Sequence, residues 1–134
     1  MTNGILGFSN SFTGLSESLE LVGDHAYGYA SILVPANSLT TMLKFTTGNF
    51  YMVAKWQVEG DLQQIGNDAI NYVLLLNGTT IVDATYAPSN DAQYIDTPTN
   101  IIIPAYTEFE TQMTHNQGGA NIAFQHLLTG RIYR

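Results

Sequence analysis

Residues 70–86 read INYVLLLNGTTIVDATY, and this stretch decides the fold class. Two runs of aliphatic and β-branched residues flank Asn77-Gly78. This dipeptide favours a two-residue type I′ turn, because both turn positions require a positive φ. The twist of that turn matches the twist of the strands on either side. We therefore expect two antiparallel strands that close on each other here.

Further strands are predicted before this hairpin. Residues 50–59 alternate, which indicates a strand with one face in a core. The predicted core face consists of Phe50, Met52, Ala54, Trp56 and Val58. Residues 39–47 alternate in the same way, and Thr47-Gly48-Asn49 predicts a hairpin or a sharp corner between the two segments. Residues 26–34 are rich in strand formers and end at Pro35.

Residues after the hairpin extend the pattern to the end of the chain. A surface excursion is predicted for residues 87–99, and a short apolar run follows it. In residues 106–113, the side chains predicted to face inward are Thr107, Phe109, Thr111 and Met113. A final strand is predicted from residue 120 to about 133, with His126 on its apolar face and a bend or bulge at Gly130. About eight strands in all predict an all-β sandwich or barrel.

The chain of 134 residues suits one domain with a short extension. Residues 1–24 mix Gly, Ser, Asn and Thr with isolated apolar residues, which predicts an N-terminal arm that ends in one short strand. Residues 25–134 are predicted to form the β domain.

The composition excludes several classes of protein. Charged residues make up 11% of the chain, against roughly a quarter in typical domains. Four Lys and Arg residues oppose eleven Asp and Glu residues, so nucleic-acid binding is not expected at a net charge of −7. No cysteine is present, which excludes disulfides and thiolate sites. No apolar run approaches the roughly 20 residues of a membrane span, and the N-terminus lacks the features of a signal peptide.

No group of residues indicates a catalytic, metal or cofactor site. His25 and His115 are predicted to lie in loops and His126 to be partly buried in a strand, with no spacing typical of a metal site. Glu108 and Glu110 share one strand face and could present two carboxylates to a cation or a glycosidic bond, but a solvated face explains them better. We therefore expect no enzyme activity, no metal and no cofactor.

Tyrosines are the candidates for contacts with other chains. Tyr51 and Tyr106 fall opposite the best apolar set of their strands, so each is predicted on the outer surface of a sheet. Tyrosine is a favoured strand residue in any case. Aromatic residues with few charges around them are also typical of the core of an interface, so we hypothesise that both tyrosines contact other subunits.

Four segments in order resemble a known group of proteins: 31–46, the turn Leu76-Asn-Gly-Thr79, residues 101–110, and the closing Leu128-Thr-Gly-Arg-Ile-Tyr133. They resemble the capsid decoration (cement) and head-fibre modules of tailed phages, and the resemblance covers roughly residues 26–134. It implies a single antiparallel jelly-roll β-sandwich, which is often trimeric. No functional residue can be transferred from it.

The resemblance implies a non-enzymatic virion structural protein, made in the host cytoplasm. The expected role is a homotrimeric decoration or cement subunit that binds the major capsid protein or other virion proteins on the outer capsid surface and stabilises the particle. The arm is the candidate for docking, through Ile5, Leu6, Phe8 and Phe12. A penton or minor capsid subunit, or a carbohydrate-binding or receptor-binding sandwich of a fibre, remains an alternative.

Overall fold

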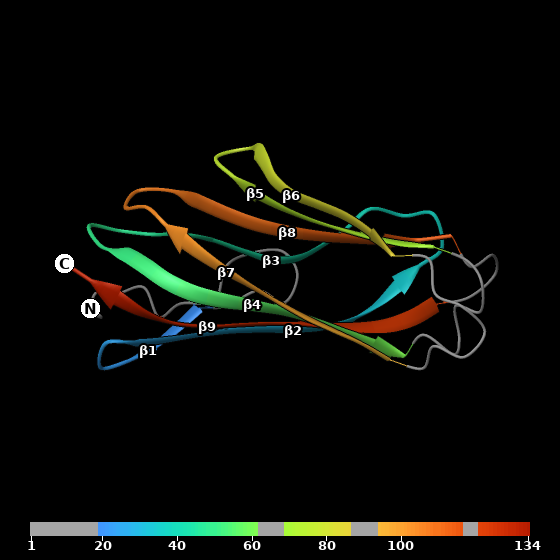
Figure 1. Ribbon diagram of the computed structural model, residues 1–134, viewed down its shortest axis with the longest axis horizontal. Helices are drawn as coiled ribbons and strands as arrows, with labels where there is room; N and C mark the ends of the chain where they lie inside the picture. The colour runs from blue at the N-terminus through green and yellow to red at the C-terminus, as the bar shows by residue number, and fades with distance from the viewer. Residues whose placement is uncertain (1–18, 62–68, 87–93, 117–120) are drawn as a thin grey trace.

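The structure is a computed structural model, and it describes residues 19–61, 69–86, 94–116 and 121–134. These residues form nine β-strands (Figure 1). Among them there is no helix long and apolar enough to cross a membrane. The strands are β1 (Leu19–Val22), β2 (His25–Pro35), β3 (Thr40–Thr46), β4 (Tyr51–Asp61), β5 (Ile70–Leu76), β6 (Thr79–Tyr86), β7 (Tyr94–Ile103), β8 (Glu108–His115) and β9 (Asn121–Tyr133).

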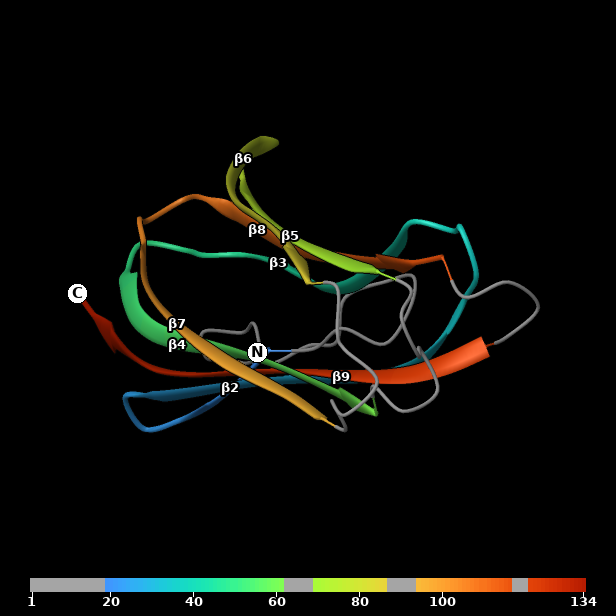
Figure 2. The ribbon, with the colours of Figure 1, turned by 45° about the vertical axis from the view of Figure 1, so that its right-hand side comes forward.

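The strands form two antiparallel sheets that face each other (Figures 1 and 2). The five-stranded sheet has the order β1-β2-β9-β4-β7, and the four-stranded sheet has the order β3-β8-β5-β6. Apart from the short edge strand β1, each sheet has four strands, and consecutive strands repeatedly cross from one sheet to the other. This arrangement is that of a jelly roll. The predicted jelly-roll sandwich is therefore confirmed.

Alternating side chains of both sheets fill the space between them. Trp56, Phe109 and Phe124 are the largest fully buried side chains, and they come from β4, β8 and β9. The inward sets predicted for residues 50–59 and 106–113 are both buried. Large residues sit beside small ones: Gly28 of β2 pairs with Leu128 of β9, which in turn pairs with Trp56. Residues 26–30 of β2 thereby contribute only small side chains to the interior, whereas Val34 at the other end of β2 is fully buried.

The predicted hairpin is present. Asn77 and Gly78 join β5 to β6 with φ values of 52° and 79°, as a type I′ turn requires. The register shifts by one residue between Leu74 and Leu75, so a bulge lies near the turn. Asn77 also contacts β8: its side-chain Oδ1 accepts a hydrogen bond of 2.9 Å from the backbone N–H of Glu108.

The connection from β3 to β4 is a corner and not a hairpin. The two strands belong to different sheets, so the chain crosses the sandwich between Thr46 and Tyr51. Buried Thr47 fixes this crossing: its hydroxyl donates to the carbonyl oxygen of Pro104 at 2.8 Å and accepts from the backbone N–H of Thr107, also at 2.8 Å.

Two details differ from the sequence predictions. Strand β7 begins at Tyr94, inside the segment predicted as a surface excursion, and it includes Pro98. Proline is compatible with β7 because that strand is an edge of its sheet, where one side of the backbone has no partner strand. Gly130 lies in an unbroken register with both β2 and β4, so the predicted bulge is absent. A Cβ there would lie 2.5 Å from the carbonyl oxygen of Val53, which explains the glycine by close approach of the backbone.

Candidate interaction face

Exposed apolar side chains gather on the outer face of the five-stranded sheet, the lower layer in Figure 1. Eleven large hydrophobic residues are exposed among the described residues, and only three of them, Leu39, Ile81 and Tyr106, lie elsewhere. The other eight alternate with buried residues on their strands and therefore share this face. We call it the five-stranded outer face, and its eight apolar residues are Val22, Tyr27, Tyr29, Leu33, Tyr51, Val53, Ile102 and Tyr133.

The pleat of β2 positions the most exposed part of this face. Tyr27, Tyr29 and Leu33 are 45%, 55% and 62% exposed, whereas Gly28 and Ala30 between them are buried. Strand pairing brings Tyr29 opposite Leu127 of β9, which extends the apolar surface towards the centre of the sheet. These β2 residues were not among the contact residues predicted from the sequence.

Tyr51 lies where it was predicted, on the outer surface of a sheet. It is 43% exposed and stacks on Tyr133 of β9, with 5.2 Å between the ring centroids. Tyr106 lies elsewhere, because it belongs to the turn before β8 and has a φ of 54°. Its backbone N–H donates to the carbonyl oxygen of Gly48, so its 71% exposed ring stands at the end of the sandwich and not on a sheet face. That part of the prediction is wrong, and subunit contacts of either tyrosine stay a prediction.

The predicted docking residues Ile5, Leu6, Phe8 and Phe12 lie outside the described residues. The last part of the predicted arm is described and forms β1, which pairs with β2 in register from Leu19 to Val22. Leu19 is 1% exposed and so belongs to the core.

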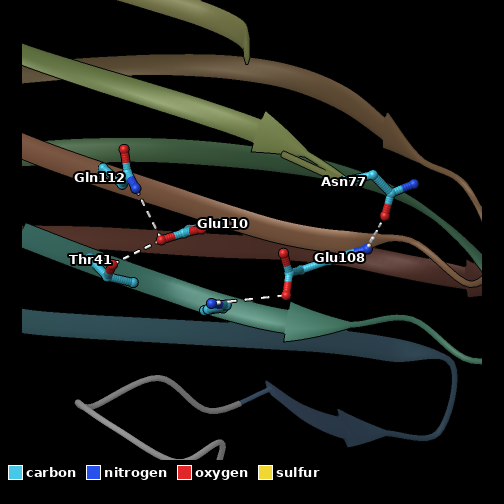
Figure 3. A network of polar contacts seen from close by, with 6 residues as sticks. Thr41, Asn77, Glu108, Glu110 and Gln112 are labelled. Carbon is cyan, nitrogen blue, oxygen red and sulfur yellow. Dashed lines mark hydrogen bonds and ion pairs between the residues drawn. The ribbon is translucent and has the colours of Figure 1, made fainter. Parts of the chain in front are cut away.

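The four-stranded sheet carries a network of polar side chains on β3 and β8 instead (Figure 3). The Glu110 carboxylate accepts hydrogen bonds from the Thr41 hydroxyl at 2.8 Å and from the Gln112 side-chain amide at 3.1 Å. The Glu108 carboxylate lies 3.9 Å from the Lys44 ammonium. Each carboxylate therefore has partners in its own sheet, which fits the solvated face that the sequence analysis favoured. No group of three or more His, Cys, Asp or Glu that could hold a metal occurs among the described residues.

His126 is fully buried, not partly buried as predicted, and it forms the centre of a polar cluster in the core. Its Nδ1 accepts from the Trp56 indole N–H at 3.2 Å and lies 2.9 Å from the Thr111 hydroxyl. An indole N–H can only donate, so the ring proton is on Nε2, which faces the Met113 sulfur at 3.4 Å. Burial lowers the pKa of the His126 imidazole to about 3. The neutral ring is thus a structural hydrogen-bonding group.

The other two histidines also differ from their predicted loop positions. His115 is the last residue of β8 and is 2% exposed, and its Nε2–H donates to the carbonyl oxygen of Val34 at 2.7 Å. The polar run Thr114-His115-Asn116 concealed this continuation of the alternating pattern. His25 is the exposed first residue of β2. The three histidines therefore occupy two separate core positions and one surface position.

Comparison with known proteins gives distant similarities only. No protein-family model and no curated protein sequence matches this chain. Among solved structures, it is similar to the VP2 subviral particle of infectious bursal disease virus, with a TM-score of 0.46 and 10% identity over 94% of this chain and 38% of that one. The chain thus spans well under half the length of that protein.

Two carbohydrate-binding structures show a similarity of the same order. One is the EclA C-terminal domain, described as a sugar-binding protein, with a TM-score of 0.41 and 13% identity over 97% of this chain and 87% of that one. The other is a family 35 carbohydrate-binding module from an environmental isolate, with a TM-score of 0.37 and 16% identity over 96% and 82% of the two chains. At such identities and TM-scores, none of these similarities assigns a function to the chain.

Proposed function

We propose that this chain is a non-enzymatic virion structural protein: a capsid decoration or cement subunit that binds the outer capsid surface as a homo-oligomer and stabilises the particle. The observation that supports this most is the concentration of eight of eleven exposed large hydrophobic residues on one sheet face. Exposed apolar patches of this kind mark sites of association between proteins. The sequence resemblance to phage decoration and head-fibre modules supports a location on the virion. It also implies that the oligomer is a homotrimer.

The polar features of the fold agree with a binding role. His126 is held neutral in the core by burial, and Glu108 and Glu110 have partners within their sheet. These groups stabilise the jelly roll, and the outer faces are left for contacts. A protein of a virus particle needs a stable fold, because it binds its neighbours through many copies of the same shallow contact.

Particles from the organism that encodes the chain provide the test. They would be purified on a density gradient and probed, intact and disrupted, with an antiserum against this protein. A decoration subunit cosediments with the particles and is detected on intact ones. Absence from the particles contradicts the proposal, whereas detection only after disruption, or at a copy number limited to the vertices, favours a minor capsid or penton subunit.

The N-terminal arm has its own test, because its docking role rests on sequence alone. Deletion of residues 2–14 should abolish binding to particles that lack the protein, while the far-ultraviolet circular dichroism of the jelly roll stays unchanged. The deletion ends before the first described strand at Leu19, so the sandwich keeps all nine strands. Unaltered binding would show that the arm does not dock.

A carbohydrate-binding role of a fibre module is the second candidate. One feature favours it: Tyr27 and Tyr29 stand two residues apart on β2 with both rings exposed on one face, an arrangement suited to stacking on sugar rings. Trp56 is fully buried and so cannot take part. A glycan-array signal that is lost in Tyr29→Ala, with unchanged Trp56 fluorescence, would establish this role in place of decoration.

A further inference from the structure

The size of the five-stranded outer face is the first observation that bears on its partner. Eight apolar side chains that are about half exposed, and that offer roughly 200 Å² each when fully exposed, leave on the order of 800 Å² of surface per copy. This sum is about the area that each partner contributes to a stable protein–protein interface.

The edges of the sandwich are poorly suited to association. Strand β1 has only four residues, and β7 carries Pro98. Pairing of β3 with β8 shifts between Thr41 and Leu43, and pairing of β6 with β5 shifts between Leu74 and Leu75. Short strands, proline and bulges are features that prevent edge-to-edge pairing. Contacts between copies are therefore expected on a face.

The two outer faces differ in charge as well as in apolar area. The four-stranded outer face carries one cation, Lys44, against Asp83, Glu108 and Glu110 among the described side chains. Its exposed carboxylates would face each other if two copies met there, which is unfavourable for chains of net charge −7. This face would suit a basic partner better than another copy of the chain.

The described charged side chains of the five-stranded outer face are balanced instead. Its described charged side chains are two acidic residues, Glu20 and Glu59, and two basic residues, Lys55 and Arg131. Two of the four cations of the whole chain therefore lie on the face that also has the apolar residues. A strongly charged partner would gain little electrostatic attraction from these balanced charges. A second copy of the same chain therefore meets a smaller excess of described carboxylates here than on the four-stranded outer face.

We propose that copies of this chain associate with one another through the five-stranded outer face. The partner is a second copy of the chain, and the contact centres on Tyr27 and Tyr29 of β2. It extends to Leu33 in one direction along the strands and to Val53 of β4 in the other. This inference rests on the proposed function only for its setting. A face that contacts the same face of a second copy closes a two-fold dimer, so this contact forms a dimer and not the homotrimer that the resemblance implies. The four-stranded outer face then remains free for other partners.

Light scattering coupled to size exclusion tests the inference on the full chain at micromolar concentration. The wild type should elute at a multiple of the 14.7 kDa chain mass. Leu33→Glu and Tyr29→Glu should each reduce the mass to that of one chain. Both positions are more than half exposed in a single copy, so the fold should persist, as circular dichroism would verify. The matched control is Ile81→Glu, which places the same charge on another exposed aliphatic residue, 51% exposed on β6, and should stay oligomeric.

Two results would overturn the inference: a wild type that is monomeric, or an oligomer that survives both substitutions on β2. A monomer that loses particle binding in Leu33→Glu would assign the face to the capsid surface instead. The inference would then fail, while the capsid-binding part of the proposed function would stand. An oligomer that is dissociated by Leu33→Glu but absent from particles would support the inference while the proposed function failed.

Discussion

Acid should destabilise the fold through His126. The unfolded imidazole takes up a proton near its ordinary pKa of 6.5, whereas burial lowers the pKa in the folded chain to about 3. Below pH 6.5 the unfolded state therefore binds more protons, so the free energy of unfolding falls as the pH drops towards 3. At about 1.4 kcal/mol per pKa unit, the loss is about 2 kcal/mol between pH 7 and pH 5 and about 4 kcal/mol by pH 3.

Urea unfolding followed by fluorescence measures this loss, because the only tryptophan, Trp56, is buried and hydrogen-bonded to His126. His126→Gln removes the titrating group, and the variant should lose about 2 kcal/mol less than the wild type between pH 7 and pH 5. The control His25→Gln changes an exposed histidine and leaves His126 in place, so it should keep most of the wild-type loss. If the wild type and His126→Gln lost the same free energy of unfolding between pH 7 and pH 5, His126 would not be the cause of the acid sensitivity.

Three further predictions concern packing, hydrogen bonding and salt. Gly130→Ala should lower the free energy of unfolding by about 1–3 kcal/mol, because the new Cβ would clash with the backbone of β4. The control Gly48→Ala makes only ordinary van der Waals contacts, so it should lower the free energy of unfolding by less in the same urea titration. Thr111→Val should lower the free energy of unfolding by about 1–3 kcal/mol, because the buried Thr111 hydroxyl accepts a hydrogen bond from the Leu43 N–H and contacts His126. The control Thr46→Val, at an exposed position of β3, should change the free energy of unfolding by less than about 0.5 kcal/mol. Moderate salt should increase the oligomeric mass in light scattering, because it screens the net charge of −7, and a decrease would contradict the balanced contact.

Much of the fold follows from local patterns. Alternation on β4 and β8 predicted which side chains are buried, and Asn77-Gly78 predicted the β5–β6 hairpin, because these signals depend on the pleat and on turn geometry alone. Local patterns did not predict which distant strands pair with each other. Whether residues 39–59 form a hairpin or a corner depends on which sheet each strand joins, and Thr47 decides it through contacts with Pro104 and Thr107, far along the chain.

The candidate site was harder to predict than the fold. On hydrophobicity alone, Tyr27, Tyr29 and Leu33 of β2 would be expected inside and the small residues Ala26, Gly28 and Ala30 outside, but the structure has the reverse. Trp56 and other large side chains already fill the interior beside β2, so only small residues fit there. This outcome depends on the packing of three strands from both halves of the chain, which no local pattern reveals.

In the assembled protein, another copy of the chain should cover the five-stranded outer face. The most direct measurement is tyrosine nitration, located by mass spectrometry, in the oligomeric wild type and in the Leu33→Glu variant. Tyr72, which is 8% exposed within one copy, should react slowly in both and serves as the internal reference. Tyr27 and Tyr29 should react slowly in the wild type and rapidly in the variant. Rapid nitration of both in the assembled wild type would contradict this prediction.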